Sequence, residues 1–226
     1  MELKLMEKKI LEGMDFHARE PISIIARRLK MSKQRVIYNI NKLEKEGIIQ
    51  GYYADINPSK LGITIYLIYL TFQKISTEKE ETFINHLNNS LLSLNVSTQG
   101  KWDHSFAILA KDIYEFREKY STIMKSYEQY IKDKRITLVT DFWYYQQRFD
   151  NEEKREHSAM NGPSTKMSLD NIDNKILRML GENARISLLE LSEHTKLTPN
   201  AVRSRIKSLE KNKVILSYRV MINYNK

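Results

Sequence analysis

The sequence predicts an α+β protein in which two winged helix-turn-helix modules flank a central ferredoxin-like (βαββαβ) domain. Three observations support this fold class. An ungapped internal repeat joins the two ends, each copy shows three short helical segments and then a strand, and the middle alternates strands with helices. The predicted parts are a first module over residues 1–60, the sheet domain over 61–149, a linker over 150–167 and a second module over 168–226. A chain of 226 residues is long enough for several small domains, each with its own core.

The internal repeat is the strongest feature of the sequence. A shift of 166 residues aligns residues 1–60 with 167–226, and 18 of the 60 positions are identical. Identical stretches include Lys9-Ile10-Leu11 with Lys175-Ile176-Leu177, Ala18-Arg19 with Ala184-Arg185, and Leu43-Glu44-Lys45 with Leu209-Glu210-Lys211. One register kept over this length indicates a duplicated module, and the large separation indicates two domains rather than a solenoid.

Each copy has the apolar spacing of three short helices. The first helix carries apolar side chains three and four residues apart, and Asp170 followed by Asp173 indicates its start in the second copy. The third helix begins at Ser32, and at Thr198 followed by Pro199, because a hydroxyl N-cap and a proline at the first helical position are typical starts. The predicted buried stripe of this helix is Val36, Ile40 and Leu43, and in the second copy Val202, Ile206 and Leu209.

A strand follows the third helix in each copy. Residues 48–53 and 214–219 combine β-branched and aromatic side chains, a pattern typical of a strand or wing. Three short helices, a three-residue turn and a β wing together describe a winged helix-turn-helix.

The face of the third helix opposite its buried stripe is polar and basic in both copies. Arginine, glutamine and asparagine can pair with base edges, while lysine and serine bind phosphate oxygens. A charged face on an isolated helix is usually only solvated, but this helix is the one that a helix-turn-helix points outward. The predicted DNA-binding residues are Ser32, Lys33, Gln34, Arg35, Tyr38, Asn39, Asn41, Lys42 and Lys45, and Thr198, Asn200, Arg203, Ser204, Arg205, Lys207 and Lys211.

The net charge of +9 lies in the two ends of the chain. Residues 1–60 hold 12 Lys and Arg against 8 Asp and Glu, and residues 167–226 hold 11 against 6. Residues 61–166 hold 14 of each and are neutral. A polyanion is therefore the expected partner of both ends, and with this module that partner is double-stranded DNA.

The module resembles the leucine-responsive, or Lrp/AsnC, family of prokaryotic transcriptional regulators. The residues that carry the match are 173–177, 183–187, 190–191 and 202–210 in the second copy, and 32–49 and 51–62 in the first. The resemblance implies a regulator whose third helix enters the major groove. The first copy has Asn39 where the family, and Arg205 here, has arginine, and the second has Lys213 where a C-cap glycine is expected. We therefore expect the two modules to differ in DNA affinity and in the sequences they contact.

Residues 63–147 alternate strands and helices. The predicted strands are 63–73, 92–99, 105–110 and 136–145, and the predicted helices are 77–90 and 113–130. This order is that of a ferredoxin-like sandwich, in which two helices cover one face of a single sheet. The other face needs a partner, so we predict a homodimer that forms sheet to sheet, with higher oligomers left open.

A short loop in the central domain matches a second feature of the family. There the domain is an effector-binding, or RAM, domain whose loop carries Gly-x-aromatic-Asp, and Gly100-Lys101-Trp102-Asp103 fits this pattern. The resemblance implies an amino acid or similar small effector near this loop, at a dimer interface. The alternative is that Gly100 and Asp103 form a β-turn and Trp102 packs on the sheet.

The composition and motifs carry no enzyme or membrane signature. The absence of cysteine excludes disulfides, a thiol nucleophile and cysteine-ligated metals. The sequence has neither a glycine-rich phosphate loop nor a nucleophile elbow, and its five histidines are scattered, so we expect no catalytic residue, metal or cofactor. The longest apolar run, 63–70, is far short of the roughly 20 residues of a membrane helix. With no signal peptide expected either, we predict a cytoplasmic protein.

Two other functional classes remain open. Siroheme decarboxylases share the two-domain fold, and His104, next to the Gly100 loop, is the histidine with a site-like position. An interaction scaffold could also use winged helices to bind proteins. The duplicated basic face favours DNA binding over both. The second copy ends at Lys226, which matches Lys60, so either the protein has three parts or a second RAM-like domain follows in a longer chain.

Overall fold

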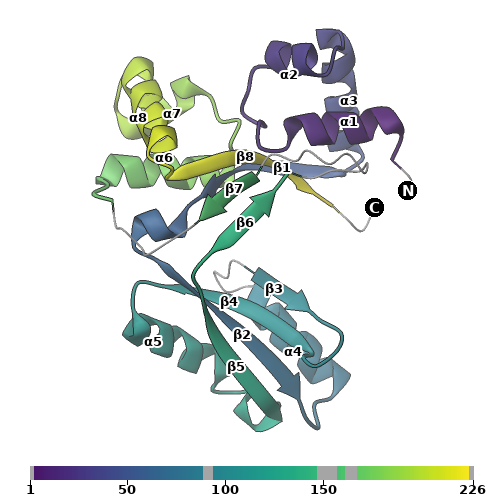
Figure 1. Ribbon diagram of the computed structural model, residues 1–226, viewed down its shortest axis with the longest axis vertical. Helices are drawn as coiled ribbons and strands as arrows, with labels where there is room; N and C mark the ends of the chain where they lie inside the picture. Colours follow the sequence, from purple (N-terminus) through teal and green to yellow (C-terminus); the bar gives the residue numbers. More distant parts are fainter. Residues whose placement is uncertain (1–2, 89–93, 147–156, 161–166, 224–226) are drawn as a thin grey trace. The chain divides into compact units, whose positions relative to one another are not determined.

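The computed structural model describes residues 3–88, 94–146, 157–160 and 167–223, which form two compact units. The first unit contains both winged modules and the segment that begins at Trp143, and the second contains the central sheet (Figure 1). The two ends of the chain, which the sequence suggested as separate domains, are therefore joined in one body. Among the described residues, no helix is both long enough and apolar enough to cross a membrane.

Both modules have the predicted three helices and one strand. The first contains α1 (Leu5–Met14), α2 (Ile22–Arg28), α3 (Lys33–Lys45) and β1 (Ile49–Ile56). The second contains α6 (Asn171–Glu182), α7 (Leu188–Thr195), α8 (Pro199–Lys211) and β8 (Ile215–Ile222). The predicted helix starts are confirmed: Ser32 and Thr198 are N-caps whose side chains accept backbone hydrogen bonds, and Asp170 forms a capping box with Asp173.

The buried stripes of α3 and α8 are confirmed as well. All six predicted stripe residues are at most 5% exposed. The core of the first module also includes Val220, which lies on β8 of the second copy. Removing that strand would open the first core, so the two modules depend on each other for burial.

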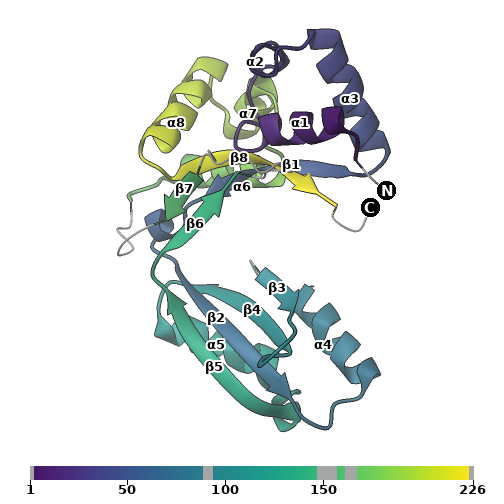
Figure 2. The same ribbon diagram turned by 45° about the vertical axis from the view of Figure 1, so that its right-hand side comes forward.

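Strands β1 and β8 pair antiparallel with each other and form a two-stranded sheet shared by the two modules (Figures 1 and 2). Tyr53 lies opposite Arg219, and these two positions are equivalent in the repeat. On either side of this pair, Tyr52 lies opposite Val220 and Ala54 lies opposite Tyr218. Because Tyr52 is equivalent to Tyr218 and Ala54 to Val220, the 166-residue shift converts one of these pairs into the other. A local twofold axis therefore passes between Tyr53 and Arg219, and the duplicated module forms a pseudo-dimer within one chain.

The second unit is the predicted ferredoxin-like sandwich. Its elements are β2 (Thr64–Phe72), α4 (Thr77–Asn88), β3 (Leu94–Ser97), β4 (His104–Ala110), α5 (Ile113–Met124) and β5 (Ile131–Val139), with short 3₁₀ turns at Pro58–Leu61 and Glu128–Tyr130. The strand order is β3-β4-β2-β5, and every neighbouring pair is antiparallel. Its core joins Tyr66, Ile68 and Leu70 of β2 to side chains of α4 and α5, so the helices cover one face (Figure 2).

Several predicted boundaries in the middle of the chain are wrong. The strand predicted over 136–145 is two strands, β5 and β6 (Phe142–Tyr145), and β6 pairs with β7 (His157–Met160) inside the predicted linker. β5 begins at Ile131, earlier than predicted, because its residues 132–135 are charged and do not show the apolar pattern of a strand. β5 is an edge strand, and an edge strand tolerates solvated charges. The helix predicted over 113–130 ends at Met124, and buried Tyr127, which immediately precedes the 3₁₀ turn Glu128–Tyr130, continues the apolar spacing beyond that end. The rest of the predicted linker up to residue 166, and the predicted positions 89–90 and 92–93, lie outside the described residues.

Candidate nucleic-acid interface

The outward faces of α3 and α8 expose nearly all of the predicted DNA-binding residues. On α3, Tyr38 is 69% exposed, and Gln34 and Arg35 are exposed beside it. On α8, Arg203 and Lys207 are exposed in the same way. The predicted residues that are only partly exposed are Asn39, Lys42 and Arg205. The structure thus brings each predicted set together on one helix face.

The three partly exposed residues are held by contacts inside the protein. The side-chain amide of Asn39 donates a hydrogen bond of 2.8 Å to the carbonyl oxygen of Arg35, one turn back on α3. The ammonium of Lys42 lies 2.6 Å from a carboxylate oxygen of Glu7 on α1. This contact is the main reason why the pKa of Glu7 is lowered. Lys42 also lies 3.7 Å from a carboxylate oxygen of Glu46.

Arg205 makes the corresponding contact in the second module. Its guanidinium lies 2.8 Å from a carboxylate oxygen of Asp170 and 2.8 Å from one of Asp173. The backbone N–H of Asp173 and then Arg205 lower the pKa of Asp170. Glu7 and Asp173 occupy equivalent positions in the repeat. Glu7 pairs with Lys42, whereas Asp173 pairs with Arg205, which is equivalent to Asn39 and therefore lies three residues earlier in the repeat than Lys42. Each module therefore joins its third helix to its first with an ion pair, built from a different position.

The contact between the modules is isologous, and the local pattern of neither copy predicts it. A guanidinium nitrogen of Arg19 donates to the carbonyl oxygens of Ala184 and, at 2.8 Å, Ile186. In return, Arg185 donates to the carbonyl oxygen of Ala18 at 2.8 Å. These residues form the Ala-Arg pairs that are identical in the two copies. That identity at matched positions is the signal in the sequence that could have revealed the interface.

Two tyrosines connect this interface to the outward helices. The carbonyl oxygens of Tyr52 and Tyr218 each accept a hydrogen bond of 2.9 Å from the other module, at the two interface alanines. Their hydroxyls donate to Glu44 on α3 and Glu210 on α8, at 2.6 Å in both cases. The guanidinium of Arg185 lies 4.3 Å from the centre of the Tyr52 ring. Burial raises the pKa of both phenols. The shared strands thus fix the outward helices relative to the interface.

A polar cluster near the local axis breaks the symmetry of the pair. Arg219 donates two hydrogen bonds of 3.0 Å to the buried carboxylate of Asp15. Burial raises the pKa of nearby Asp55 to about 6, although Arg219 opposes that change and the hydroxyl of Ser217 donates to its carboxylate at 3.3 Å. Burial also raises the pKa of Tyr144 on β6 to about 12. The equivalents of Asp15 and Arg219 are glycine and tyrosine, so the second copy has no matching pair.

The predicted effector loop forms a tight turn between β3 and β4. Gly100 has a φ of 125°, which favours glycine. A carboxylate oxygen of Asp103 accepts a hydrogen bond of 2.8 Å from the N–H of Phe72. The ring of Trp102 lies 5.8 Å from that of Tyr69, and Lys101 lies over it at 5.0 Å. These contacts agree with the alternative in which Gly100 and Asp103 form a turn and Trp102 packs on the sheet. An effector role for the loop stays a prediction.

No metal centre is evident in the part of the chain that the structure describes, since no three His, Asp, Glu or Cys side chains group together there. His104 is 1% exposed. One of its ring nitrogens lies 2.6 Å from the amide oxygen of Asn95, and the other lies 3.4 Å from the hydroxyl of Ser97. Burial lowers the pKa of His104 and so favours the neutral ring.

Comparison with known proteins identifies the duplicated module. A family model described as winged helix-turn-helix DNA-binding matches residues 6–50 and again residues 169–215. The regulator LrpA of Pyrococcus horikoshii is 38% identical over 77 residues, which are 34% of this chain and 52% of that protein. The chain thus spans about half the length of that relative. The regulator Ptr1 of Methanocaldococcus jannaschii is 32% identical over 113 residues, which are 49% of this chain and 74% of that protein.

Solved structures share the fold. An AsnC family transcriptional regulator from Agrobacterium tumefaciens has a TM-score of 0.54 at 16% identity, over 67% of this chain and 95% of its own. The siroheme decarboxylase NirDL has a TM-score of 0.60 at 17% identity, over 96% of this chain and 65% of its own. At these identities the likeness concerns the fold alone. Taken with the sequence relatives, the duplicated helix-turn-helix and the sheet domain show that the chain belongs to the Lrp/AsnC family of transcriptional regulators.

Proposed function

We propose that this chain is a DNA-binding transcriptional regulator in which α3 and α8 enter the major groove together. The observation that carries the proposal is the isologous pairing of the two modules through β1 and β8. Helix-turn-helix proteins ordinarily dimerise so that two third helices contact half-sites whole turns of the double helix apart. Here a single chain supplies both helices. One chain is then sufficient for one operator.

The two helices present different chemistry to DNA. On α3, Gln34 and Arg35 are suited to bidentate contacts with adenine and guanine, and exposed Tyr38 adds an aromatic surface. On α8, Arg203 and Lys207 add cationic groups suited to guanine and to phosphate. A pseudo-twofold unit with unlike faces fits an operator whose two half-sites differ in sequence. The exposed members of the predicted set are the proposed DNA contacts.

We assign a supporting role to the three partly exposed members of that set. Lys42 and Arg205 pair with carboxylates of their own first helices, and Asn39 bonds to its own helix. A cation that already pairs with a carboxylate gains less binding free energy from a phosphate contact than an unpaired cation does, because its existing contact must first be broken. These residues therefore act by holding α3 and α8 in place.

We also propose that the central domain forms a homodimer through the sheet face that the helices leave uncovered. Leu94 and Val96 on β3 are 40% and 41% exposed, and they lie opposite Ala107 and Ser105 on the far side from the helix-covered core. Leu67 on β2 lies on the same face. A contiguous apolar sheet face of this kind ordinarily packs against another surface, and a second copy supplies a matching one.

A small effector near the Gly100 loop remains a secondary proposal. A cavity of about 510 Å³ beside the loop is lined by Asp103, Thr98 and Gln99. Its volume lies within the range of small-molecule sites. Because the Asp103 carboxylate already accepts a backbone hydrogen bond, we expect it to shape this cavity rather than to bind the ligand directly.

The enzyme alternative rests on the fold that the chain shares with NirDL. His104 is the residue that would have to carry chemistry, and it is buried and bonded on both ring nitrogens. This environment supports a structural role for His104. The curated relatives are transcription regulators by name, which favours the DNA-binding proposal.

Fluorescence anisotropy with a duplex DNA pool tests this proposal. We expect affinity to fall about a thousandfold or more between roughly 50 and 200 mM salt, as for proteins with several phosphate contacts. Arg35→Ala and Arg203→Ala should each weaken binding about 10- to 100-fold. The charge-matched controls Arg117→Ala and Lys125→Ala, which remove exposed cations from the central domain, should bind like the parent. Absence of binding at about 50 mM salt would favour the protein-interaction scaffold instead.

A further inference from the structure

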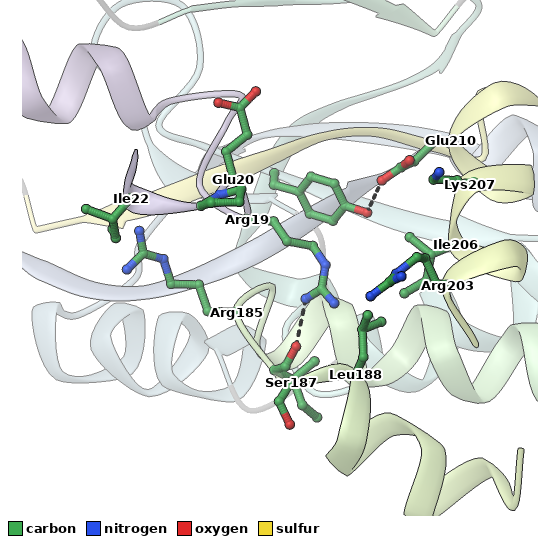
Figure 3. Close-up of a pocket in the computed structure, with 13 residues that line it drawn as sticks. Arg19, Glu20, Ile22, Arg185, Ser187, Leu188, Arg203, Ile206, Lys207 and Glu210 are labelled. Carbon is green, nitrogen blue, oxygen red and sulfur yellow. Dashed lines mark hydrogen bonds between the residues drawn. The ribbon is translucent and has the colours of Figure 1, made fainter. Parts of the chain in front are cut away.

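A cavity of about 610 Å³ lies between the two helix-turn-helix modules. Its wall combines the loop that leads into α2, the start of α7, one side of α8 and Tyr218 of β8 (Figure 3). Both modules therefore contribute to it. The volume falls within the range of small-molecule sites and is far larger than a single phosphate group requires.

The charge of this cavity is unbalanced. Its cationic side chains are Arg19, Arg185, Arg203 and Lys207, and its carboxylates are Glu20 and Glu210. The formal surplus is two positive charges. Glu20 is further neutralised because it pairs with Arg28. Concentrated positive charge in a concave site attracts anions.

The cations of the cavity have unused binding capacity. Among the described residues, Arg203 and Lys207 pair with no carboxylate. Arg19 donates hydrogen bonds to backbone carbonyl oxygens and lies over the ring of Tyr218, but it pairs with no carboxylate among the described residues, and burial lowers its pKa. One guanidinium nitrogen of Arg185 is buried and has no hydrogen-bond partner among the described residues, and Figure 3 shows this guanidinium beside Ile22, apart from those of Arg19 and Arg203. Figure 3 shows Arg19 and Arg203 extending toward the same space above Ser187 and Leu188.

The remaining wall is apolar. It is formed by Pro21, Ile22, Ile186, Leu188 and Ile206. Apolar walls combined with a few convergent cations are typical of a site for an organic molecule with an anionic group. A DNA phosphate would use the cations but would leave these apolar walls uncovered.

The repeat supplies a comparison within the chain. The positions equivalent to Arg203 and Lys207 in the first module are Ile37 and Asn41. The duplication therefore carries this pair of cations on one side only. That asymmetry points to a single site per chain and gives a natural pair of replacement residues.

From these observations we propose that the cavity between the modules binds one small organic anion, a carboxylate or phosphate carried on an apolar body. Arg203 and Lys207 belong to the proposed DNA-contacting face of α8. If the proposed function holds, occupancy of the cavity withdraws two cations from DNA and weakens DNA binding. The binding of the anion itself does not depend on the proposed function.

The test uses the full chain without DNA and starts with the fluorescent probe 8-anilinonaphthalene-1-sulfonate. We expect saturable binding of one probe per chain, displaced by indole-3-acetate but not by its uncharged analogue indole-3-acetamide. The variant Arg203→Ile with Lys207→Asn carries the residues of the first module and should weaken binding about tenfold or more. The variant Arg117→Ala with Lys125→Ala is the charge-matched control and should bind like the parent. Circular dichroism checks that both variants remain folded.

Three outcomes would overturn the proposal. Equal displacement by indole-3-acetamide would show that the site does not select a charge. Unchanged binding by the Arg203→Ile, Lys207→Asn variant would place the probe elsewhere. Absence of saturable binding, together with a loss of duplex affinity in that variant, would assign these cations to the DNA backbone. A failure of the DNA-binding proposal alone would leave probe binding unchanged, so the two results are distinguishable.

Discussion

The two winged modules have the same backbone plan but different surfaces. Both bury equivalent stripes, cap α3 and α8 with a hydroxyl, and place a matched tyrosine–glutamate contact behind the outward helix. The outward faces differ at most positions, and the ion pair between first and third helices is built from Lys42 in one module and Arg205 in the other. Duplication has kept the residues that make the interface and has varied the residues that face outward.

In this duplicated fold, the residues that differ between the copies are mainly those that face outward. A homodimer must present two identical faces, because one sequence serves both halves. A pseudo-dimer within one chain is free of that constraint, and each face can acquire its own contacts. The same freedom explains why the cationic cavity has Arg203 and Lys207 on one side and Ile37 and Asn41 at the equivalent positions on the other.

The largest expected effect concerns the interface that the modules share. Arg19→Ala combined with Arg185→Ala removes guanidinium hydrogen bonds to carbonyls of the opposite module. Hydrogen bonds of charged groups contribute about 1.5–3 kcal/mol each, so the loss of these three bonds should lower the free energy of unfolding by about 4.5–9 kcal/mol. Urea denaturation measures this change. Arg178→Ala, on the exposed surface of α6, is the matched control and should change stability little. An unchanged unfolding midpoint for the double variant would mean that the modules do not depend on this contact.

A smaller effect concerns the polar cluster at the local axis. The pKa of Asp55, about 6 in the folded protein, lies above its ordinary value near 4. The folded state therefore retains a proton that the unfolded state loses, and this contribution is greatest below pH 4 and is lost as the pH rises through 6. Above pH 6 the buried charge destabilises the fold. Asp55→Asn keeps an oxygen for the hydroxyl of Ser217 and should stabilise the protein by about 1–2 kcal/mol at pH 8.

Thermal unfolding at pH 8, pH 5 and pH 3.5 measures this difference. The advantage of the Asp55→Asn variant should be largest at pH 8, roughly half as large at pH 5 and absent near pH 3.5, because the unfolded carboxyl is already ionised at pH 5. An advantage of equal size at all three pH values, or a loss at pH 8, would contradict the assignment of a buried carboxylate with a raised pKa.

The smallest effect compares the ends of the two outward helices. Gly47 and Lys213 are equivalent, and both have a positive φ, 67° and 57°. A lysine in this region is strained by its Cβ, whereas glycine is not. Lys213→Gly should therefore raise the free energy of unfolding by about 1 kcal/mol, and Gly47→Ala should lower it by a similar amount. Calorimetry of the two variants decides this, and a destabilised Lys213→Gly protein would contradict it.

Much of the fold could be predicted from the sequence because its signals are local. Hydroxyl N-caps at Ser32 and Thr198, the apolar stripes and the strand–helix alternation each depend on neighbouring residues. The pairing of β1 with β8 could not be predicted in this way, since it joins residues far apart and no local pattern encodes it. The predicted start of β5 was wrong because charged residues on this edge strand interrupt the apolar pattern. The predicted end of α5 was wrong because the turn that follows the helix continues its apolar spacing.

The candidate site was predictable to a similar extent. Exposure of Arg35 and Arg203 follows from helical spacing, and the structure agrees with it. The ion pairs of Lys42 and Arg205 depend on residues of another helix, so spacing alone could not separate them from the free cations. The cationic cavity depends on both modules at once and has no signature in either copy taken by itself.

Selection of preferred sequences from a random duplex pool, with the chain at a concentration where single complexes form, tests whether both modules of one chain bind DNA together. We expect a bipartite site with two different half-sites, spaced by about one helical turn or a whole number of turns. Arg35→Ala should relax the preference in one half-site and Arg203→Ala in the other. Two identical half-sites in a palindrome, or one short site that only one of the variants alters, would contradict the claim that both modules of a single chain bind DNA together.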